Sequence, residues 1–371
     1  MLRCGKPVLK NQQSKVLIRC MAIKFGQPSA KNVALFYNDI YEVELPPKHR
    51  FPMDKYRLVR TLLQEEYFAD KNVLFAESPL ATSMELKMTH CPDYVERYLS
   101  GRLTDMEVRK TGFPHNQDNI NRACSSAGGT VAAMRAVLAH PSSLFSGHIA
   151  GGTHHAFYNY GEGFCVFSDI AVASNIALNE YPDLVKKILI IDLDVHQGNG
   201  NAVLFRDDPR VFTFSMHCKD NYFSKKEESN VDVELEPGTT DEEYLAKLNM
   251  WLPLLFDSVQ PQLVFYQAGV DIYEGDRLGK LKISREGLRK RNDAVYKEVV
   301  KRKTKCVVTM GGGYVTNKHV FVLAFETHQG LHINFSFFAD TPERATQRLI
   351  HFKNSLCVTR TFIDRASLTQ R

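Results

Sequence analysis

One stretch of the sequence decides the fold, residues 188–200, which read ILIIDLDVHQGNG. It opens with four apolar residues, and a short apolar run of this kind is typical of a strand buried on both faces of a parallel sheet. Aspartates, a histidine and glycines follow directly, so charged groups stand where the strand core ends. In open α/β sheets, functional sites are built at the carboxyl ends of strands. The stretch therefore predicts a buried parallel strand with a site at its end.

Two residues of this stretch suit a metal ion. Asp194 and His196 are two positions apart, so an extended backbone places their side chains on one side. A carboxylate and an imidazole together suit a divalent metal such as zinc. The alternative at this point is an aspartate-rich turn at a strand end, with the carboxylates in a capping role.

Composition bounds the class of protein. The chain has 371 residues with 44% hydrophobic composition, which is ample for a large core in one or two domains. A net charge of +5 and a pI near 8.6 are too weak to predict nucleic-acid binding. The eight cysteines show no Cys-x-x-Cys spacing, which fits reduced thiols of an intracellular protein. No apolar run approaches the length of a membrane span, so we expect no membrane association.

The amino-terminal segment, residues 1–32, is basic, and the first acidic residue of the chain is Asp39. Leaders that are basic and free of acids include organelle transit peptides. The segment is poor in serine and only loosely amphipathic, which favours a disordered basic extension over a targeting signal.

Apolar runs alternate with segments of helical spacing. Strands are expected at 33–37, 188–191, 211–216, 263–267 and 306–310, and helices at 54–66, 93–99, 123–139, 170–179, 241–256 and 284–301. Thr240 and Ser284 are expected N-caps, and Glu243 gives Thr240 the pattern of a capping box. This alternation predicts a single α/β domain over residues 33–315, with a mostly parallel sheet flanked by helices.

Two glycine-containing segments precede the decisive strand. Residues 151–155 end in His154 and His155, two imidazoles that could serve as a base and an acid. A pair of ordinary loop histidines is the alternative. Residues 161–165 form a glycine turn that carries Phe164, for which a packing role is favoured from this segment alone.

Two further segments, which follow the decisive strand in the sequence, also lie at the ends of expected strands. Residues 266–271 end in Asp271, which alone could equally cap a helix, and residues 310–314 end in Tyr314, which alone could equally be a core residue. Asp194, His196 and Asp271 together give three protein ligands from two strand ends. Three ligands with one open position for water are the pattern of a catalytic zinc. Tyr314 could then donate a hydrogen bond to a polarised carbonyl oxygen.

The order of these motifs resembles the zinc-dependent histone deacetylase family. The motifs are Gly-Gly-x-His-His at 151–155, Gly-Phe-Cys at 163–165, Asp-Leu-Asp-x-His-Gln-Gly-Asn-Gly at 192–200, Ala-Gly-x-Asp at 268–271 and Gly-Gly-Tyr at 312–314. Details similar to the class IV branch are Gln197, Asn199 and residues 233–239 and 274–279. The resemblance covers about residues 33–315 and implies the arginase/deacetylase fold, a single doubly wound domain.

The resemblance also implies the reaction, hydrolysis of Nε-acetyl-lysine in histones or other proteins. It implies zinc on Asp194, His196 and Asp271, with His155 as proton shuttle. His154 would be bonded to Asp192 and stabilise developing charge, and Tyr314 would bind the oxyanion. The resemblance further implies a substrate channel at Gly163, Phe164 and Tyr222, with Asn221 and Phe223. It implies a structural K⁺ or Na⁺ bound by Asp192, Asp194, His196, Ser215 and Met216. A second such cation is implied near Phe205, Asp208 and Val211.

Two features depart from the usual family pattern. Asn199 stands where an aspartate commonly orients the second histidine, and a neutral amide stabilises an imidazolium less than a carboxylate does. We therefore expect His155 to be less basic than in relatives with the aspartate. Residues 316–371 do not match the family and are expected to be an atypical carboxyl-terminal segment.

Alternatives to this function remain open at the level of sequence. A long-chain fatty-acyl-lysine deacylase differs only in the acyl group, and a deacetylase-like binding module would be catalytically weak. An arginase-like hydrolase with two manganese ions would need more carboxylates than these motifs supply. The family implies corepressor-type protein partners and a location in nucleus and cytoplasm, while the basic leader keeps mitochondrion or plastid as the alternative.

Overall fold

The computed structural model describes residues 33–67, 73–222, 224–315 and 324. The predicted extension 1–32 and nearly all of the predicted segment 316–371 lie outside the described residues. Within the described part of the chain, no helix is long and apolar enough to cross a bilayer.

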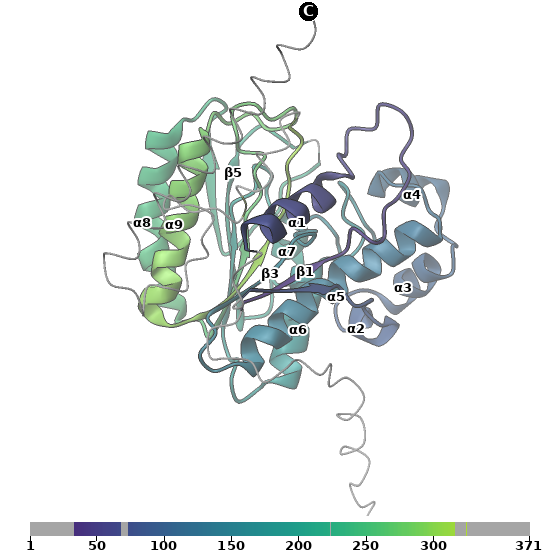
Figure 1. Ribbon diagram of the computed structural model, residues 1–371, viewed down its shortest axis with the longest axis horizontal. Helices are drawn as coiled ribbons and strands as arrows, with labels where there is room; N and C mark the ends of the chain where they lie inside the picture. Colours follow the sequence, from purple (N-terminus) through teal and green to yellow (C-terminus); the bar gives the residue numbers. More distant parts are fainter. Residues whose placement is uncertain (1–32, 68–72, 223, 316–323, 325–371) are drawn as a thin grey trace, which may run out of the picture.

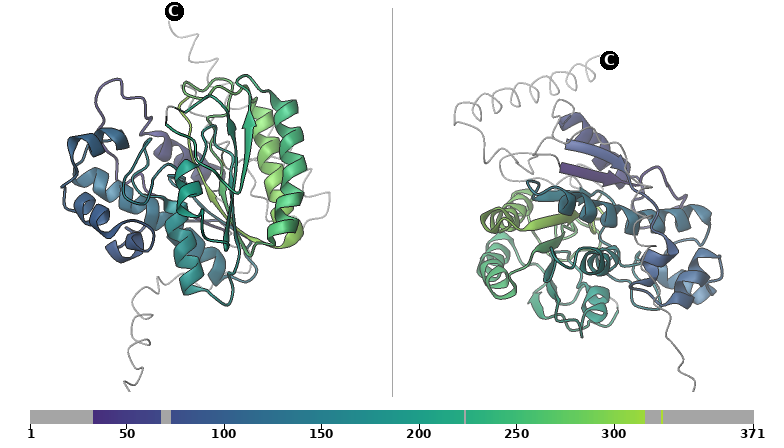
Figure 2. Two further views of the ribbon diagram at one scale, coloured as in Figure 1. Left: turned by 180° about the vertical axis from the view of Figure 1, so that it is seen from behind. Right: turned by 90° about the horizontal axis from the view of Figure 1, so that it is seen from below.

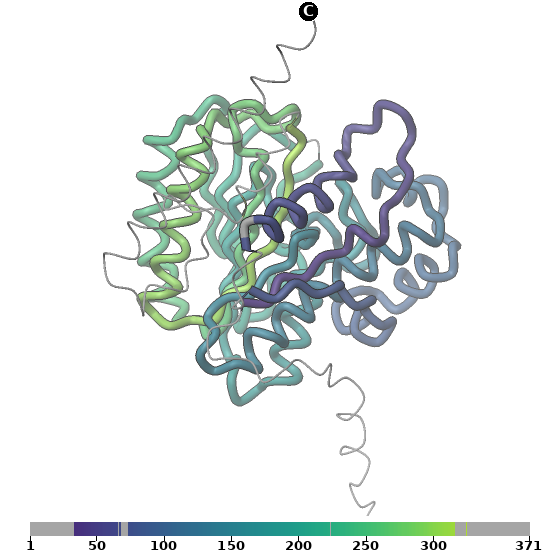
Figure 3. The backbone as a smooth tube through the Cα atoms, in the orientation of Figure 1, coloured from purple at the N-terminus to yellow at the C-terminus, as the bar shows by residue number. Residues whose placement is uncertain are grey.

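Eight parallel strands form one sheet in the order β2-β1-β3-β8-β7-β4-β5-β6. Their bounds are Val33–Tyr37 (β1), Val73–Glu77 (β2), Phe145–His148 (β3), Ile188–Asp192 (β4), Val211–Cys218 (β5), Val231–Leu235 (β6), Leu263–Gln267 (β7) and Lys305–Thr309 (β8). The first and the last strand along the described chain, β1 and β8, lie close together in the sheet, since only β3 separates them (Figure 3). Figure 1 shows the sheet in the middle of the molecule, with helices around it.

The helices cover both faces of the sheet. Their bounds are Lys55–Glu66 (α1), Ser83–Lys87 (α2), Pro92–Leu99 (α3), Asp105–Thr111 (α4), Gln117–Ala139 (α5), Asp169–Glu180 (α6), Asn199–Leu204 (α7), Asp241–Val259 (α8) and Arg285–Arg302 (α9). Helices α8 and α9 lie side by side on one face, and α5 and α6 lie on the other (Figure 2).

Strand β4 shows why the sequence requires two layers of helices. Leu189 and Ile191 belong to the core cluster that includes residues of α1, α8 and α9, whereas Ile188 and Ile190 belong to the cluster that includes residues of α3, α5 and α6. All four side chains are at most 1% exposed. Because successive strand residues point to opposite faces, a continuous apolar run needs cover on both sides. The predicted doubly wound α/β architecture is therefore confirmed, and every described pairing in the sheet is parallel.

Several elements escaped the sequence patterns. Strands β2, β3 and β6 and helices α2, α4 and α7 were not expected, since each has at most seven residues. Helix α5 begins at Gln117, capped by the Asn116 side chain, rather than at Ala123.

The two expected caps differ in outcome. Ser284 caps α9, and its hydroxyl accepts a hydrogen bond from the Gly287 N–H at 3.0 Å. The Thr240 capping box is wrong, because the Thr240 side chain makes no capping hydrogen bond to α8. Asp241, the first residue of α8, instead accepts hydrogen bonds from the Ser284 N–H and hydroxyl. The start of α8 is thus fastened to the cap of α9.

This difference gives a matched pair of stability variants. Ser284→Ala should lower the free energy of unfolding by about 1–2 kcal/mol, because it removes the cap of α9 and its bond to Asp241. Thr240→Ala is the control and should change the free energy of unfolding by less than about 0.5 kcal/mol. Urea denaturation of both variants measures the difference, and equal losses would contradict the assignment of the cap.

Candidate active site

The carboxyl ends of four strands converge on one edge of the sheet. Asp194 and His196 follow β4, and Asp271 follows β7, which is paired with β4 so that Asp192 lies beside Gln267. The His154 and His155 segment follows β3, and the Tyr314 segment follows β8. Since sites of open parallel sheets lie at this edge, the topology gathers every predicted catalytic segment in one place.

Asp194, His196 and Asp271 come together as predicted. All three are buried, and their ligand atoms lie within 4.8 Å of one another. The Oδ2 atom of Asp271 lies 3.3 Å from His196 Nδ1. Glycine at position 312 keeps the space beside this oxygen free, since a Cβ there would lie 2.1 Å from it. Two carboxylates and an imidazole gathered this closely fit a divalent cation such as zinc.

The charges of this triad depend strongly on one another. Burial and the nearby Asp194 charge raise the pKa of Asp271 to about 7. Burial lowers the pKa of His196, but its hydrogen bonds with Asp194 and Asp271 outweigh burial and raise the pKa to about 10. In the protein without metal, protonated His196 is thus the nearest cation that offsets the two carboxylates. A dication at the same place would replace that proton.

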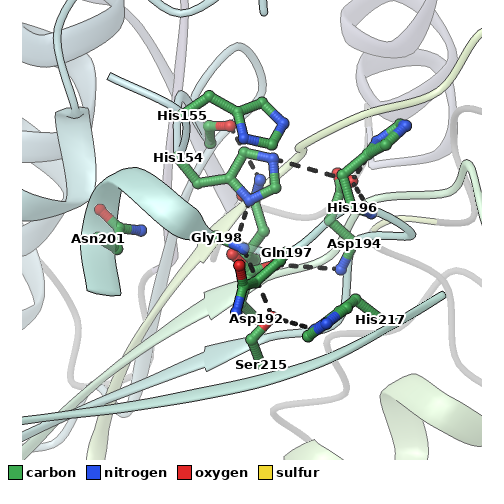
Figure 4. A network of polar contacts seen from close by, with 12 residues as sticks. His154, His155, Asp192, Asp194, His196, Gln197, Gly198, Asn201, Ser215 and His217 are labelled. Atoms are coloured by element: carbon green, nitrogen blue, oxygen red, sulfur yellow. Dashed lines mark hydrogen bonds and ion pairs between the residues drawn. The ribbon is translucent and has the colours of Figure 1, made fainter. Parts of the chain in front are cut away.

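His154 and His155 lie against each other with ring centroids 4.0 Å apart. The Nδ1 atom of His154 donates to Asp192 at 2.7 Å, as predicted, and its Nε2 lies 3.8 Å from Asp194 (Figure 4). Burial lowers the pKa of His154, but the charges of Asp192 and Asp194 outweigh burial and raise it to about 9. His154 is therefore an imidazolium at neutral pH.

The second histidine has the opposite charge state. Burial, together with the charges of His154 and His196, places the pKa of His155 well below its usual range. Its Nδ1 lies 2.7 Å from Asn199 Oδ1, which also accepts the Gly200 N–H at 3.0 Å. Because that amide oxygen accepts both bonds, the His155 Nδ1 carries the hydrogen and its Nε2 carries a lone pair. His155 is therefore a neutral base beside a charged neighbour.

Tyr314 lines the same cavity as His155 and Asp194. Its backbone N–H donates to Asp276 at 2.7 Å, and Arg277 Nε donates to its carbonyl oxygen at 2.7 Å. Burial raises the pKa of the Tyr314 phenol well above its usual range, so the hydroxyl remains a hydrogen-bond donor. The role of Asp276 as the anchor of Tyr314 was missed, although it lies in the run 274–279 that resembles the class IV branch.

The predicted channel residues lie at this cavity. Phe164 lines it and has a φ of 67°, and its N–H donates to Thr111 O at 3.0 Å. It also packs on Phe51 and Phe113, so the packing role predicted for its segment holds as well. Tyr222 stacks on His155 with ring centroids 4.2 Å apart and planes 11° apart.

The remaining wall residues are close to the metal ligands. Glycine is needed at position 163, since a Cβ there would lie 2.3 Å from the Tyr222 hydroxyl. Asn221 Nδ2 lies 3.5 Å from His196 Nε2 and donates to Leu278 O at 2.8 Å. Phe223, the third residue expected in this wall, lies outside the described residues.

Two buried cations at the cavity were missed. Lys55 and Arg122 are 1% and 3% exposed, and both line the cavity with the histidine pair. Lys55 Nζ donates to Gly311 O at 3.2 Å, and Arg122 donates to the Tyr56 hydroxyl at 3.2 Å. Neither residue belongs to a motif, and only the packing of α1 and α5 on the sheet brings them here.

The predicted monovalent-cation residues are close neighbours. Ser215 pairs with Asp192 in the register of β4 and β5, and Met216 follows it in β5. The Ser215 hydroxyl lies 3.0 Å from His217 Nδ1 and 3.4 Å from Gly198 N (Figure 4). The cation on this set stays a prediction.

The second cation position is formed differently. Asp208 N donates to Phe205 O, Val211 N donates to Asp208 O, and the Asp208 carboxylate binds Arg210. The backbone oxygens of this turn thus already accept protein hydrogen bonds, and a cation here also stays a prediction.

Comparisons with known proteins identify the family. The family model of the histone deacetylase domain matches residues 49–325, well over half of the chain, and so extends past residue 315 into the segment expected to be atypical. An uncharacterized protein of Picosynechococcus sp. is 41% identical over 286 residues, covering 77% of this chain and 93% of that protein. Histone deacetylase 2 of Arabidopsis thaliana is 31% identical over 307 residues, covering 78% of this chain and 76% of that protein.

More distant relatives include the acetoin utilization protein AcuC of Staphylococcus aureus, which is 26% identical over 69% of each chain. Among solved structures, the HD domain of HDA15 superposes with a TM-score of 0.67 at 21% identity, covering 79% of this chain and 87% of that one, and it supports the arginase/deacetylase fold. The chain belongs to the histone deacetylase family and carries the hydrolase domain that defines it.

The coupled charges of the triad predict how metal binding depends on pH. Zinc must displace the proton of His196, whose pKa is about 10, and the proton that about half of the Asp271 side chains carry at pH 7, so binding at this pH should release about one to two protons per site. Calorimetric titration of zinc into chelator-treated protein, in buffers of different ionisation enthalpy, measures this number. Asp271→Asn should weaken zinc binding strongly, and zinc binding without proton release would contradict the ligand set.

Proposed function

We propose that the chain is a zinc-dependent hydrolase that removes acetyl groups from lysine Nε atoms in histones or other proteins. The observation that carries the proposal is the pair of adjacent histidines, His154 bonded to the Asp192 carboxylate and His155 to the Asn199 amide, beside the buried triad of Asp194, His196 and Asp271. Amide hydrolysis needs a base for the water and an acid for the leaving amine, and this arrangement supplies a neutral base, a fixed positive charge and a metal-ligand set. Membership of the deacetylase family supports the same reaction.

The residues divide the chemistry among them. Asp194, His196 and Asp271 would hold zinc, which when bound lowers the pKa of water and polarises a carbonyl oxygen. His155 takes the proton of the attacking water at Nε2 and returns it to the amine as the amide C–N bond breaks. Asn199 keeps His155 in the tautomer that leaves Nε2 free.

Two residues stabilise the negative charge that develops on the reacting oxygen. The His154 imidazolium, held by Asp192, lies next to His155 and stabilises negative charge as it develops. Tyr314 donates its phenol hydrogen to the oxyanion, a contribution of about 2.7–4 kcal/mol for a single donor of this kind. Phe164 and Tyr222 enclose the aliphatic part of the substrate lysine and exclude water.

The residues that line the cavity favour a short acyl group. The cavity has a volume of about 30 Å³, and Lys55 and Arg122 line it with their charged groups buried. A long apolar chain in this place would leave two buried cations against hydrocarbon, which is costly. Acetyl is therefore the proposed acyl group, and a long fatty-acyl group is the alternative.

We also propose membership of the class IV branch. Gln197, one of the residues similar to that branch, donates to Glu227 O and Asp232 and accepts the Glu227 N–H. It thereby ties the zinc-ligand turn to the segment that leads into β6. A location in nucleus and cytoplasm, with corepressor-type partners, forms part of the same proposal.

Turnover of a peptide panel tests the function. We expect zinc-dependent release of acetate from acetyl-lysine peptides. Turnover of myristoyl-lysine peptides should be at least about tenfold slower, because the cations of Lys55 and Arg122 line the cavity. Asp271→Ala should abolish turnover by removing a metal ligand while the protein stays folded. Absence of turnover on every acyl-lysine peptide with zinc bound would support the binding-module alternative.

The pH dependence of turnover tests the role of Asn199. In Asn199→Asp, a carboxylate 2.7 Å from His155 Nδ1 favours the charged imidazolium, so the pKa of His155 should rise by about 1–3 units. Because the base must be neutral, the acid limb of the kcat/KM profile should move to higher pH. A profile with the wild-type acid limb would show that His155 is not the base.

A further inference from the structure

The histidine pair is carried by a short irregular segment, residues 151–153, which we call the glycine loop. On one side, Gly151 O accepts the Gly311 N–H at 3.0 Å, and Gly152 O accepts a hydrogen bond from Gln267 Nε2 at 2.8 Å. These bonds fix the carbonyl groups of the loop to the ends of β7 and β8. The Gly151 N–H donates to His148 O, but the N–H groups of Gly152 and Thr153 have a different partner.

That partner is the carboxylate of Asp169, the first residue of α6. Its Oδ2 accepts the Gly152 N–H at 2.8 Å, and its Oδ1 accepts the Thr153 N–H at 2.7 Å and lies 2.8 Å from the Thr153 hydroxyl. Asp169 has no measurable exposure. One buried carboxylate thus holds both N–H groups that directly precede His154.

Asp169 is itself held by a chain of hydrogen bonds. The Thr130 hydroxyl donates to Asp169 Oδ2 at 2.5 Å and lies 2.9 Å from His148 Nδ1, while His148 Nε2 lies 3.0 Å from the Ser78 hydroxyl. Burial lowers the pKa of His148 to about 4, so its ring is neutral. Since the single Thr130 hydrogen goes to Asp169, His148 donates from Nδ1 and accepts at Nε2 from Ser78.

Glycines clear the space that this chain of bonds needs. A Cβ at Gly151 would lie 2.7 Å from Asp169 Oδ2 and 2.6 Å from the Thr130 hydroxyl. A Cβ at Gly129 in α5 would lie 2.4 Å from both His148 Nε2 and the Ser78 hydroxyl. The backbone is therefore shaped to admit these polar groups, which connect β2, β3, α5 and α6 to the glycine loop.

We propose that Asp169 is a positioning residue for catalysis: through the glycine loop it sets the placement of His154 and His155, and Thr130 and His148 orient its carboxylate. The inference rests on the proposed function for the part that concerns turnover. Asp169 lies outside the metal triad and does not belong to the histidine pair. A loop displaced by about 1 Å would misplace both imidazoles and slow the chemical step by up to about 100-fold.

Four variants separate this role from a contribution to stability alone. Asp169→Asn keeps the size of the side chain but presents an N–H₂ group toward backbone N–H donors, and Thr130→Val keeps shape while removing the bond to Asp169. Thr130→Ser restores the hydroxyl and should restore function. Ser174→Ala is the matched control, since Ser174 is buried in the same helix and its hydroxyl has no partner within the described residues.

Kinetics of the zinc-loaded protein on acetyl-lysine peptide give the first measurement. Asp169→Asn and Thr130→Val should lower kcat by about 10- to 100-fold per folded molecule with KM changed less than about twofold, because the channel residues Gly163 and Phe164 are held by hydrogen bonds to Lys110 and Thr111 outside the glycine loop. Thr130→Ser and Ser174→Ala should keep wild-type kcat. Wild-type kcat in both Asp169→Asn and Thr130→Val, with only the melting temperature lowered, would overturn the proposal. If Asp169→Asn does not fold, Thr130→Val decides.

Histidine ring ¹⁵N–¹H signals of the full chain give a second measurement that needs no turnover. The ring N–H signals of His154 and His155, bonded to Asp192 and Asn199, should shift or broaden in Asp169→Asn and Thr130→Val and stay unchanged in Ser174→Ala. Unchanged signals in the first two variants would overturn the proposal. If the wild-type protein turns over no acyl-lysine peptide, the proposed function fails, and these signals alone decide whether Asp169 places the histidines.

Discussion

Three carboxylates, those of Asp192, Asp194 and Asp271, are buried at the ends of two neighbouring strands, each at most 1% exposed. An isolated carboxylate in such a place would cost far more free energy than one hydrogen bond restores. The rest of the site is arranged to offset this cost. The imidazolium of His154 lies between two of the carboxylates, and His196 or a dication lies between the other pair. The metal site and the charged histidine thus both offset the negative charge of the buried carboxylates.

Another buried cation contacts the turn that leads to Asp271. Arg291 of α9 is fully buried, and its guanidinium donates to Gly269 O at 2.5 Å and to Ala268 O at 3.1 Å. These carbonyl groups belong to the turn that carries Asp271 away from β7. Arg291 therefore satisfies backbone oxygens of the turn that leads to Asp271. Leaving a buried acceptor without its donor typically costs about 1–3 kcal/mol, so α9 contributes to the site as well as to the core.

The sequence predicted those features that depend on short segments. Asp194 and His196 could be assigned because their spacing and the preceding apolar run are enough to place both on one strand end. The residues that were missed come from remote segments: Lys55 and Arg122 reach the cavity through helix packing, and Asp276 reaches Tyr314 across a gap of 38 residues. Thr240 failed for the same reason, because its expected capping role was displaced by a long-range contact between Asp241 and Ser284. Local pattern fixes which side chains a strand presents, whereas their partners depend on tertiary contacts that have no periodic signal.

Three buried histidines near this edge show how far a partner decides the role of one residue type. His148 contacts two hydroxyl groups and has a pKa near 4, so it is a neutral link in a structural chain. His154 contacts a carboxylate and has a pKa near 9, so it carries a positive charge. His155 is hydrogen-bonded to the amide of Asn199 and stays neutral next to the charges of His154 and His196. Because all three are buried, desolvation alone cannot distinguish them, and the hydrogen-bond partner of each ring and the charges beside it do. The division of labour between an electrostatic group and a base thus follows from a carboxylate at position 192 and an amide at position 199.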